Sequence, residues 1–161
     1  MNKTSTRSAV RVAETLQSYA DRGVFRGFVR RPSSRGTEEF RFRWLHEATF
    51  RLRVDPVRKT LVFQDLLPNI PYRSVMDRAL RDFFSQRTSE DLPEHRRIDP
   101  ERVELLCSSR RGSVSVSLRV VRDDWEYAVK KGVSLVHEVF HGFLKGPYFE
   151  YMVENFGEPE E

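Results

Sequence analysis

The chain has 161 residues, of which 39% are hydrophobic and 32% are charged, and its formal net charge is +4. This length favours one domain, residues 1–161, with a core of its own, and the composition is typical of soluble globular proteins. No apolar run approaches the roughly 20 residues of a membrane span, and the first ten residues lack a signal-peptide pattern. The single cysteine, Cys107, allows no internal disulfide. We therefore expect a cytoplasmic protein.

Charge is distributed unevenly along the chain. Residues 22–59 contain eleven Arg or Lys against four Asp or Glu, whereas residues 147–161 contain five Glu and no Arg or Lys. These two segments therefore carry net charges of +7 and −5. A basic region of this kind can bind nucleic acid, an acidic protein, or the acidic tail of a neighbouring subunit.

The first half of the chain predicts one helix and three strands. Residues 8–23 should form a helix because apolar residues recur at helical spacing and a glycine ends the segment. Residues 30–39 predict a loop. Strands are expected at 40–44, 50–54 and 60–67, and in the first two of them aromatic or aliphatic residues alternate with arginine. This alternation predicts one apolar face and one arginine face, the latter made of Arg41, Arg43, Arg51 and Arg53.

A second helix is predicted at 72–87 and a hairpin follows it. Ser74 suits the N-cap, and Asp77 lies at the capping-box distance. The hairpin pairs strands at 102–108 and 113–121, and Cys107 should face inward as a structural thiol. The apolar side of the helix is predicted to consist of Val75, Leu80, Phe83 and Phe84.

The last long helix should begin at Asp123, as its N-cap, and end near Lys145, where Gly146-Pro147 breaks it. A short final helix is expected at 148–156. The predicted fold is thus α+β: an antiparallel five-stranded sheet with helices packed on one face, in the order α-β-β-β-α-β-β-α.

One stretch matches a catalytic signature. Residues 137–141 read His-Glu-Val-Phe-His and match the H-E-x-x-H pattern. In this one helix the chain resembles the zinc metalloproteases. His137 and His141 would project from the same side of a helix, and Glu138 could deprotonate a metal-bound water. A third ligand would have to follow, and Glu150 is a candidate. The alternative hypothesis is therefore a minimal zinc-dependent hydrolase, although a helical projection places both histidines where solvent-exposed side chains are usual.

The arginine face offers a third hypothesis, a basic nucleic-acid binder. RNA-binding sheets usually combine basic residues with exposed aromatic rings that stack on bases. Here the aromatic residues alternate away from the arginines. We therefore expect weak, salt-sensitive nucleic-acid binding at most.

The predicted order of elements covers about residues 8–156. Its features are the amphipathic first helix, the strands FRFRW and FRLRV, the helix after LLPNIPYRS, the hairpin SSRRGSVSVSLRV and the long last helix. In this order the chain resembles the YbjN-like bacterial family and the type III secretion chaperones. The resemblance implies a small, non-enzymatic, usually dimeric protein that binds segments of other proteins.

The predicted sheet independently favours a binding protein. Helices on one face leave the other face free, and a sheet edge can accept an extended peptide. The aromatic residues in 147–156 exceed what a small core needs, so we expect them to contact a second copy. We therefore predict a chaperone-like or regulatory adaptor without a cofactor, which binds itself as a homodimer and an unidentified protein. The candidate binding residues are Arg41, Arg43, Arg51, Arg53, Phe149 and Phe156.

Overall fold

The computed structural model describes residues 3–32, 36–45, 48–68 and 70–142, which form three helices and one six-stranded antiparallel sheet. None of these helices combines the length and the apolar character that a bilayer crossing requires. The strands lie in the order β1-β2-β3-β4-β6-β5, so β1 and β5 are the two edges. The elements in chain order are α1 (Lys3–Asp21), β1 (Arg26–Pro32), β2 (Glu38–Arg43), β3 (Thr49–Asp55), β4 (Thr60–Leu67), α2 (Val75–Gln86), β5 (Val103–Arg110), β6 (Ser113–Val120) and α3 (Trp125–Glu138).

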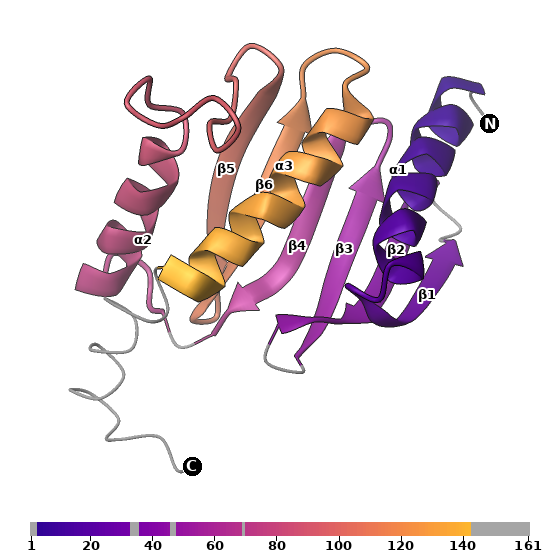
Figure 1. Ribbon diagram of the computed structural model, residues 1–161. Helices are drawn as coiled ribbons and strands as arrows, with labels where there is room; N and C mark the ends of the chain where they lie inside the picture. The colour runs from indigo at the N-terminus through magenta and orange to yellow at the C-terminus, as the bar shows by residue number, and fades with distance from the viewer. Residues whose placement is uncertain (1–2, 33–35, 46–47, 69, 143–161) are drawn as a thin grey trace.

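All three helices lie on the same side of the sheet, with α1 near β1 and β2, α3 across the middle, and α2 beside β5 (Figure 1). The core forms between these layers because alternate strand residues point toward the helices. Gly132 lets α3 approach the sheet closely, since a Cβ at this position would lie 3.0 Å from a ring carbon of Phe63. The largest fully buried side chains of the sheet are Phe40, Phe42, Leu52, Leu61, Phe63, Leu67 and Leu118.

The prediction of five strands was wrong by one strand. β1 pairs with β2 and includes Arg30–Pro32, which the sequence had assigned to a loop. The strand is hard to recognise because Gly27 has a positive φ of 60° and the register with β2 shifts between Arg26 and Val29. Such a bulge breaks the period-two pattern, so that apolar and charged residues no longer alternate. The observed order is α-β-β-β-β-α-β-β-α.

The helices also differ from the prediction: α1 is Lys3–Asp21 and not 8–23, and α2 begins at Val75 and not at residue 72. Ser74 is the N-cap of α2, as predicted, but Val75 is 76% exposed and the neighbouring Met76 is buried in its place. The N-cap of α3 is Asp124 rather than Asp123, and its side chain makes no capping hydrogen bond. α3 ends at Glu138, and residues 139–142 continue as a π-type turn. The predicted end near Lys145 and the predicted helix at 148–156 lie outside the described residues.

Candidate functional site

The His-Glu-Val-Phe-His stretch lies at the end of α3. The ring centroids of His137 and His141 lie 4.1 Å apart with the ring planes tilted by 33°, and both side chains are exposed. Among the described residues, no group of three or more His, Cys, Asp or Glu side chains is arranged to hold a metal ion. Glu150, the third ligand of the zinc hypothesis, lies outside the described residues.

Glu138 is held by two arginines. One carboxylate oxygen accepts a hydrogen bond from Arg87, whose side chain is only 8% exposed, and the other accepts from Arg96 at 3.1 Å. Arg87 is also the C-cap of α2. The carboxylate therefore joins the end of α2 to the end of α3. A carboxylate with this ion pair is not positioned as a free general base, which is the role that the zinc hypothesis gives it.

The four arginines of the predicted arginine face do lie on one face of the sheet. Arg41 on β2 is directly opposite Arg51 on β3, and Arg53 is opposite Glu39. We call Arg41, Arg43, Arg51 and Arg53 the arginine ladder. This face of the sheet is opposite the helices, since the residues between the arginines are buried against the core.

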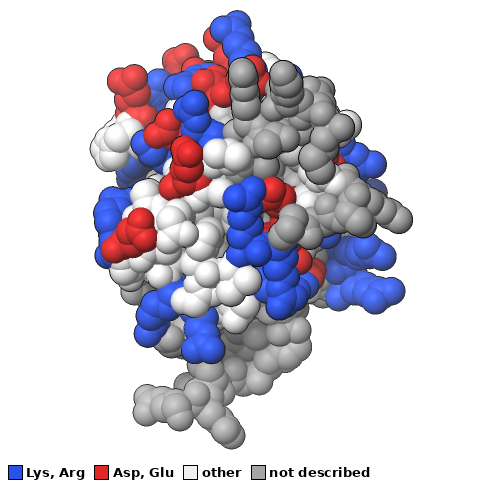
Figure 2. Space-filling view, turned by 90° about the vertical axis from the view of Figure 1, so that its right-hand side faces the viewer, with Lys and Arg blue, Asp and Glu red and all other residues white. Residues whose placement is uncertain are grey.

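Acidic partners offset the repulsion between opposing arginines, which would otherwise destabilise the strand pair. Arg41 pairs with Glu39 at 3.3 Å and Arg51 pairs with Asp65 at 2.8 Å. Asp65 reaches this face because it lies in a β-bulge of β4 with a positive φ of 49°. Figure 2, a view from the side of α1 and β1, likewise shows Lys and Arg interspersed with Asp and Glu. Two of the four ladder arginines are therefore compensated, whereas Arg43 and Arg53 form no ion pair within the described residues.

A hollow of about 450 Å³ lies between α2 and the edge strand β5. Its walls are mostly apolar or uncharged, with Phe84 and Leu105 on opposite sides. We call this feature the α2–β5 groove. It is lined by Arg81, Phe84, Ser85, Thr88, Pro100, Val103, Glu104, Leu105, Leu106 and Cys107.

The β5–β6 hairpin determines which backbone groups of β5 face this groove. Its two turn residues, Arg111 and Gly112, have φ values of 53° and 78°, typical of a type I′ turn. The pair that flanks such a turn is hydrogen-bonded, and bonded and non-bonded pairs then alternate along the strands. It follows that Val103, Leu105, Cys107 and Ser109 direct their N–H and C=O groups away from β6, toward the free edge.

Two contacts agree with this alternation and occupy one group at each end of the stretch 103–107. The N–H of Val103 donates to the carbonyl of Asp99 at 3.0 Å, and Arg81 donates to the carbonyl of Cys107 at 3.4 Å. Four groups between these ends have no hydrogen bond within the described part of the chain. They are the C=O of Val103, the N–H and C=O of Leu105, and the N–H of Cys107.

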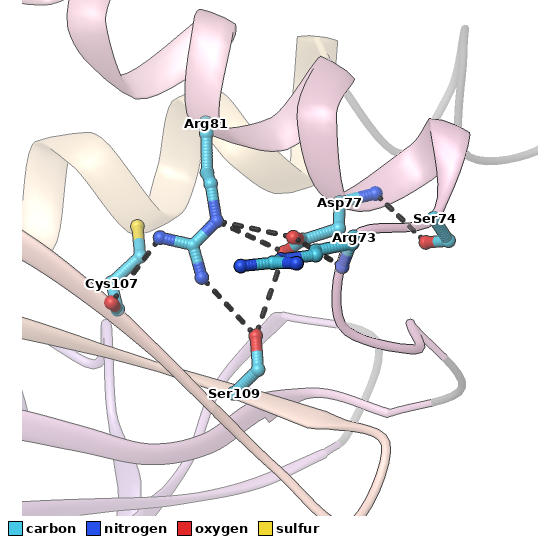
Figure 3. Close-up of polar contacts among 6 residues, drawn as sticks. All are labelled: Arg73, Ser74, Asp77, Arg81, Cys107 and Ser109. Atoms are coloured by element: carbon cyan, nitrogen blue, oxygen red, sulfur yellow. Dashed lines mark hydrogen bonds and ion pairs between the residues drawn. The ribbon is translucent and has the colours of Figure 1, made fainter.

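A buried carboxylate fixes one end of α2 against β5 (Figure 3). Asp77 is 3% exposed and accepts hydrogen bonds from the side chain of Arg81 at 3.2 Å and from the N–H of Arg73 at 3.0 Å. Arg81 in turn donates to Ser109 on β5 at 3.3 Å. The other end of α2 is fixed through Arg87. The groove between these two attachments is therefore formed before any ligand arrives.

Cys107 lines the groove but is not suited to nucleophilic chemistry. Burial raises the pKa of its thiol to about 12, and the nearby Arg81 lowers it only in part. The thiolate is the reactive form, so the thiol is inert near neutral pH. This agrees with the predicted structural role.

Sequence reasoning did not identify the groove residues as a site. Ser74 and Asp77 were predicted as a helix start, and Cys107 as an inward residue, but no sequence signal brings α2 beside β5. Phe149 and Phe156 lie outside the described residues, so their binding role stays a prediction, as does that of the arginine ladder.

Comparison of the chain with protein-family models, with curated proteins and with solved structures finds no match. The resemblance to the YbjN-like family and the type III secretion chaperones therefore stays a prediction. The observed order has one strand more than the order on which that resemblance rests.

Proposed function

We propose that the protein is a non-enzymatic adaptor that binds an extended segment of another protein by strand addition to β5. The observation that carries this proposal is the set of four open backbone groups on β5, which face a preformed and mainly apolar groove. An added strand satisfies such groups with its own backbone, and its side chains enter the neighbouring hollow.

The geometry limits the length and the strength of this interaction. The open groups lie between Val103 and Cys107, so about three residues of a partner can form strand hydrogen bonds. Four such bonds contribute about 1 kcal/mol each, and one buried apolar side chain about 2 kcal/mol more. Association costs at least about 4 kcal/mol. Binding through this edge alone is therefore weak, and contacts that flank the three residues must supply most of the affinity.

The test uses a short synthetic peptide of alternating Val and Thr with one central Leu. We expect its addition to shift the amide NMR signals of Leu105 and Cys107 and those of the α2 residues that line the groove. Ser85→Trp should fill the groove and abolish these shifts. Gln86→Trp is the matched control, because Gln86 is an exposed neighbour on α2 that does not line the groove.

Three results would count against the proposal: no shift at Leu105 at tens of millimolar peptide, where the estimated affinity predicts substantial binding, shifts centred on β1, or equal effects of the two tryptophan variants. The predicted homodimer is a separate proposal, because it depends on aromatic residues outside the described part of the chain.

A further inference from the structure

A second hollow, of about 510 Å³, adjoins the α2–β5 groove at its Val103 end. Thr88 and Pro100 line both, so a chain that leaves the groove at this end passes directly into the second hollow. Unlike the groove, this hollow is lined mainly by charged side chains. They are Glu90, Glu94, Arg97, Asp99, Glu101, Arg102 and Lys131.

The cations of the second hollow already have partners. Arg102 forms an ion pair with Asp124 at 3.0 Å and lies 3.7 Å above the ring of Tyr127. Arg97 donates to two backbone carbonyls, those of Glu90 and Leu92, and Lys131 donates to the carbonyl of His95 at 3.0 Å.

Three of the four carboxylates, in contrast, make no hydrogen bond or ion pair within the described residues, although the charge of Glu94 acts on Lys131. Asp99 accepts a hydrogen bond from the N–H of Glu101. Within the described residues, Glu90, Glu94 and Glu101 are exposed and their side chains make no hydrogen bond or ion pair. The lining contains four carboxylates against three cations, and one of these cations, Arg102, is paired with Asp124 outside the lining, so the net charge of this hollow is negative although the chain as a whole is basic.

The opposite end of the groove is positive. Arg81 lies there against the carbonyl of Cys107 and is paired with Asp77, so the positive charge comes mainly from the exposed side chains of Arg110 and Arg111 at the hairpin tip. The two ends of the groove thus differ in sign. A partner residue opposite Leu105 points its side chain toward the helices, as Leu105 does, and so do the residues two positions before and after it. At about 3.3 Å per residue these neighbours lie roughly 7 Å away, one toward each end.

We propose that the α2–β5 groove selects an extended protein segment in which an apolar residue is followed, two positions later, by Lys or Arg. This inference rests on the proposed function. The apolar side chain occupies the hollow between Phe84 and Leu105, and the cation reaches the free carboxylates of the second hollow. The cation follows the apolar residue because we assume antiparallel addition, the pairing found throughout this sheet. In that arrangement the partner residue opposite Val103 lies two positions C-terminal to the apolar residue opposite Leu105.

The test compares three peptides that share the alternating Val and Thr sequence and the central Leu. The first has Lys two positions after the Leu, the second has Lys two positions before it, and the third has Gln at both positions. The first two have the same composition and charge, so non-specific electrostatics cannot distinguish them. We expect the first to bind about fivefold more tightly than the Gln peptide, as one exposed charge interaction allows. The second should bind more weakly than the Gln peptide because its Lys faces the positive end of the groove.

The double variant Glu94→Gln/Glu101→Gln is the control on the protein side. Because neither side chain makes a hydrogen bond, the variant should fold normally. It should remove the advantage of the first peptide and leave the affinity of the Gln peptide unchanged. Equal binding of the three peptides, or tightest binding of the second, would overturn the inference and leave the proposed function intact. The absence of binding by all three would overturn both.

Discussion

Replacing Glu138 by Gln should destabilise the fold, although Glu138 belongs to a sequence that resembles a catalytic motif. The substitution keeps the shape of the side chain and removes its charge. Arg87, whose side chain is 8% exposed, would then lose its counter-charge, while Arg96 at 46% exposure would turn to water. The loss therefore depends almost entirely on Arg87.

The expected cost follows from this burial. Removing one partner of a fully buried ion pair costs about 3–5 kcal/mol. The Glu138 side chain is 19% exposed, so water can partly compensate Arg87. The expected loss of unfolding free energy is therefore at the low end, about 2–3 kcal/mol. With a urea m-value of about 2 kcal/mol per molar, the unfolding midpoint should fall by about 1–1.5 M.

Urea unfolding followed by circular dichroism measures this change. Arg96→Gln is the matched control for an exposed partner and should cost less than about 1 kcal/mol. His137→Gln, one residue from Glu138 but exposed, should change stability by less than about 0.5 kcal/mol. If Glu138→Gln were as stable as the wild type, the ion pair between Arg87 and Glu138 would not join α2 to α3 as described. That result would also restore Glu138 as a candidate catalytic base, since a general base contributes to rate and not to folding.

Three further predictions concern the thiol, the arginine ladder and the oligomeric state. Burial raises the pKa of Cys107 to about 12. At pH 8 an aromatic disulfide reagent should therefore modify the native protein at least tenfold more slowly than the urea-unfolded chain. Equal rates would contradict this prediction. Replacing the whole arginine ladder by Gln should abolish only weak nucleic-acid binding that disappears with added salt, and sequence-selective binding at high salt would refute our view of this face. Light scattering should find a dimer at micromolar concentration that Phe149→Asp or Phe156→Asp weakens, and a monomeric wild type would remove the support for the interface.

The strands that follow a simple alternation were predictable from the sequence. In β2 and β3 each aromatic or aliphatic residue faces the core, and each arginine faces away from it, so one pattern determined both faces. Ser74 was predictable for a local reason, since its side chain accepts a hydrogen bond from the N–H of Asp77 three residues later. The β5–β6 hairpin was equally local, because the glycine at its turn supports the positive φ that the turn requires.

The features that escaped prediction depend on contacts between distant residues. Arg87 and Glu138 are 51 positions apart, so nothing near the H-E-x-x-H pattern indicates that its glutamate is already paired. Asp77 was predicted only as a capping-box residue, and its contact with Ser109 on β5, 32 positions away, has no local sequence signal. The α2–β5 groove exists because these two attachments hold α2 beside an edge strand. Sequence patterns describe the elements but not the space between them.

The two edges of the sheet differ in a way that bears on where a partner can bind. Natural proteins protect exposed edges with charged residues, proline and bulges, since an open edge invites aggregation. β1 has all three: exposed arginines at Arg30 and Arg31, a bulge after Arg26, and Pro32 at its end.

β5 has neither proline nor a bulge in its pairing with β6. Its protection comes from elsewhere in the fold, since Asp99 and Arg81 occupy the N–H of Val103 and the C=O of Cys107 and α2 lies beside the strand. These contacts occupy one group on each side of Leu105 and leave the centre of the edge open. The stretch 103–107 admits about five residues in extended form, three of which form strand hydrogen bonds, whereas the arginine and the loop at its two ends disfavour pairing with a long strand. The same contacts that protect β5 therefore define the size of the ligand we propose.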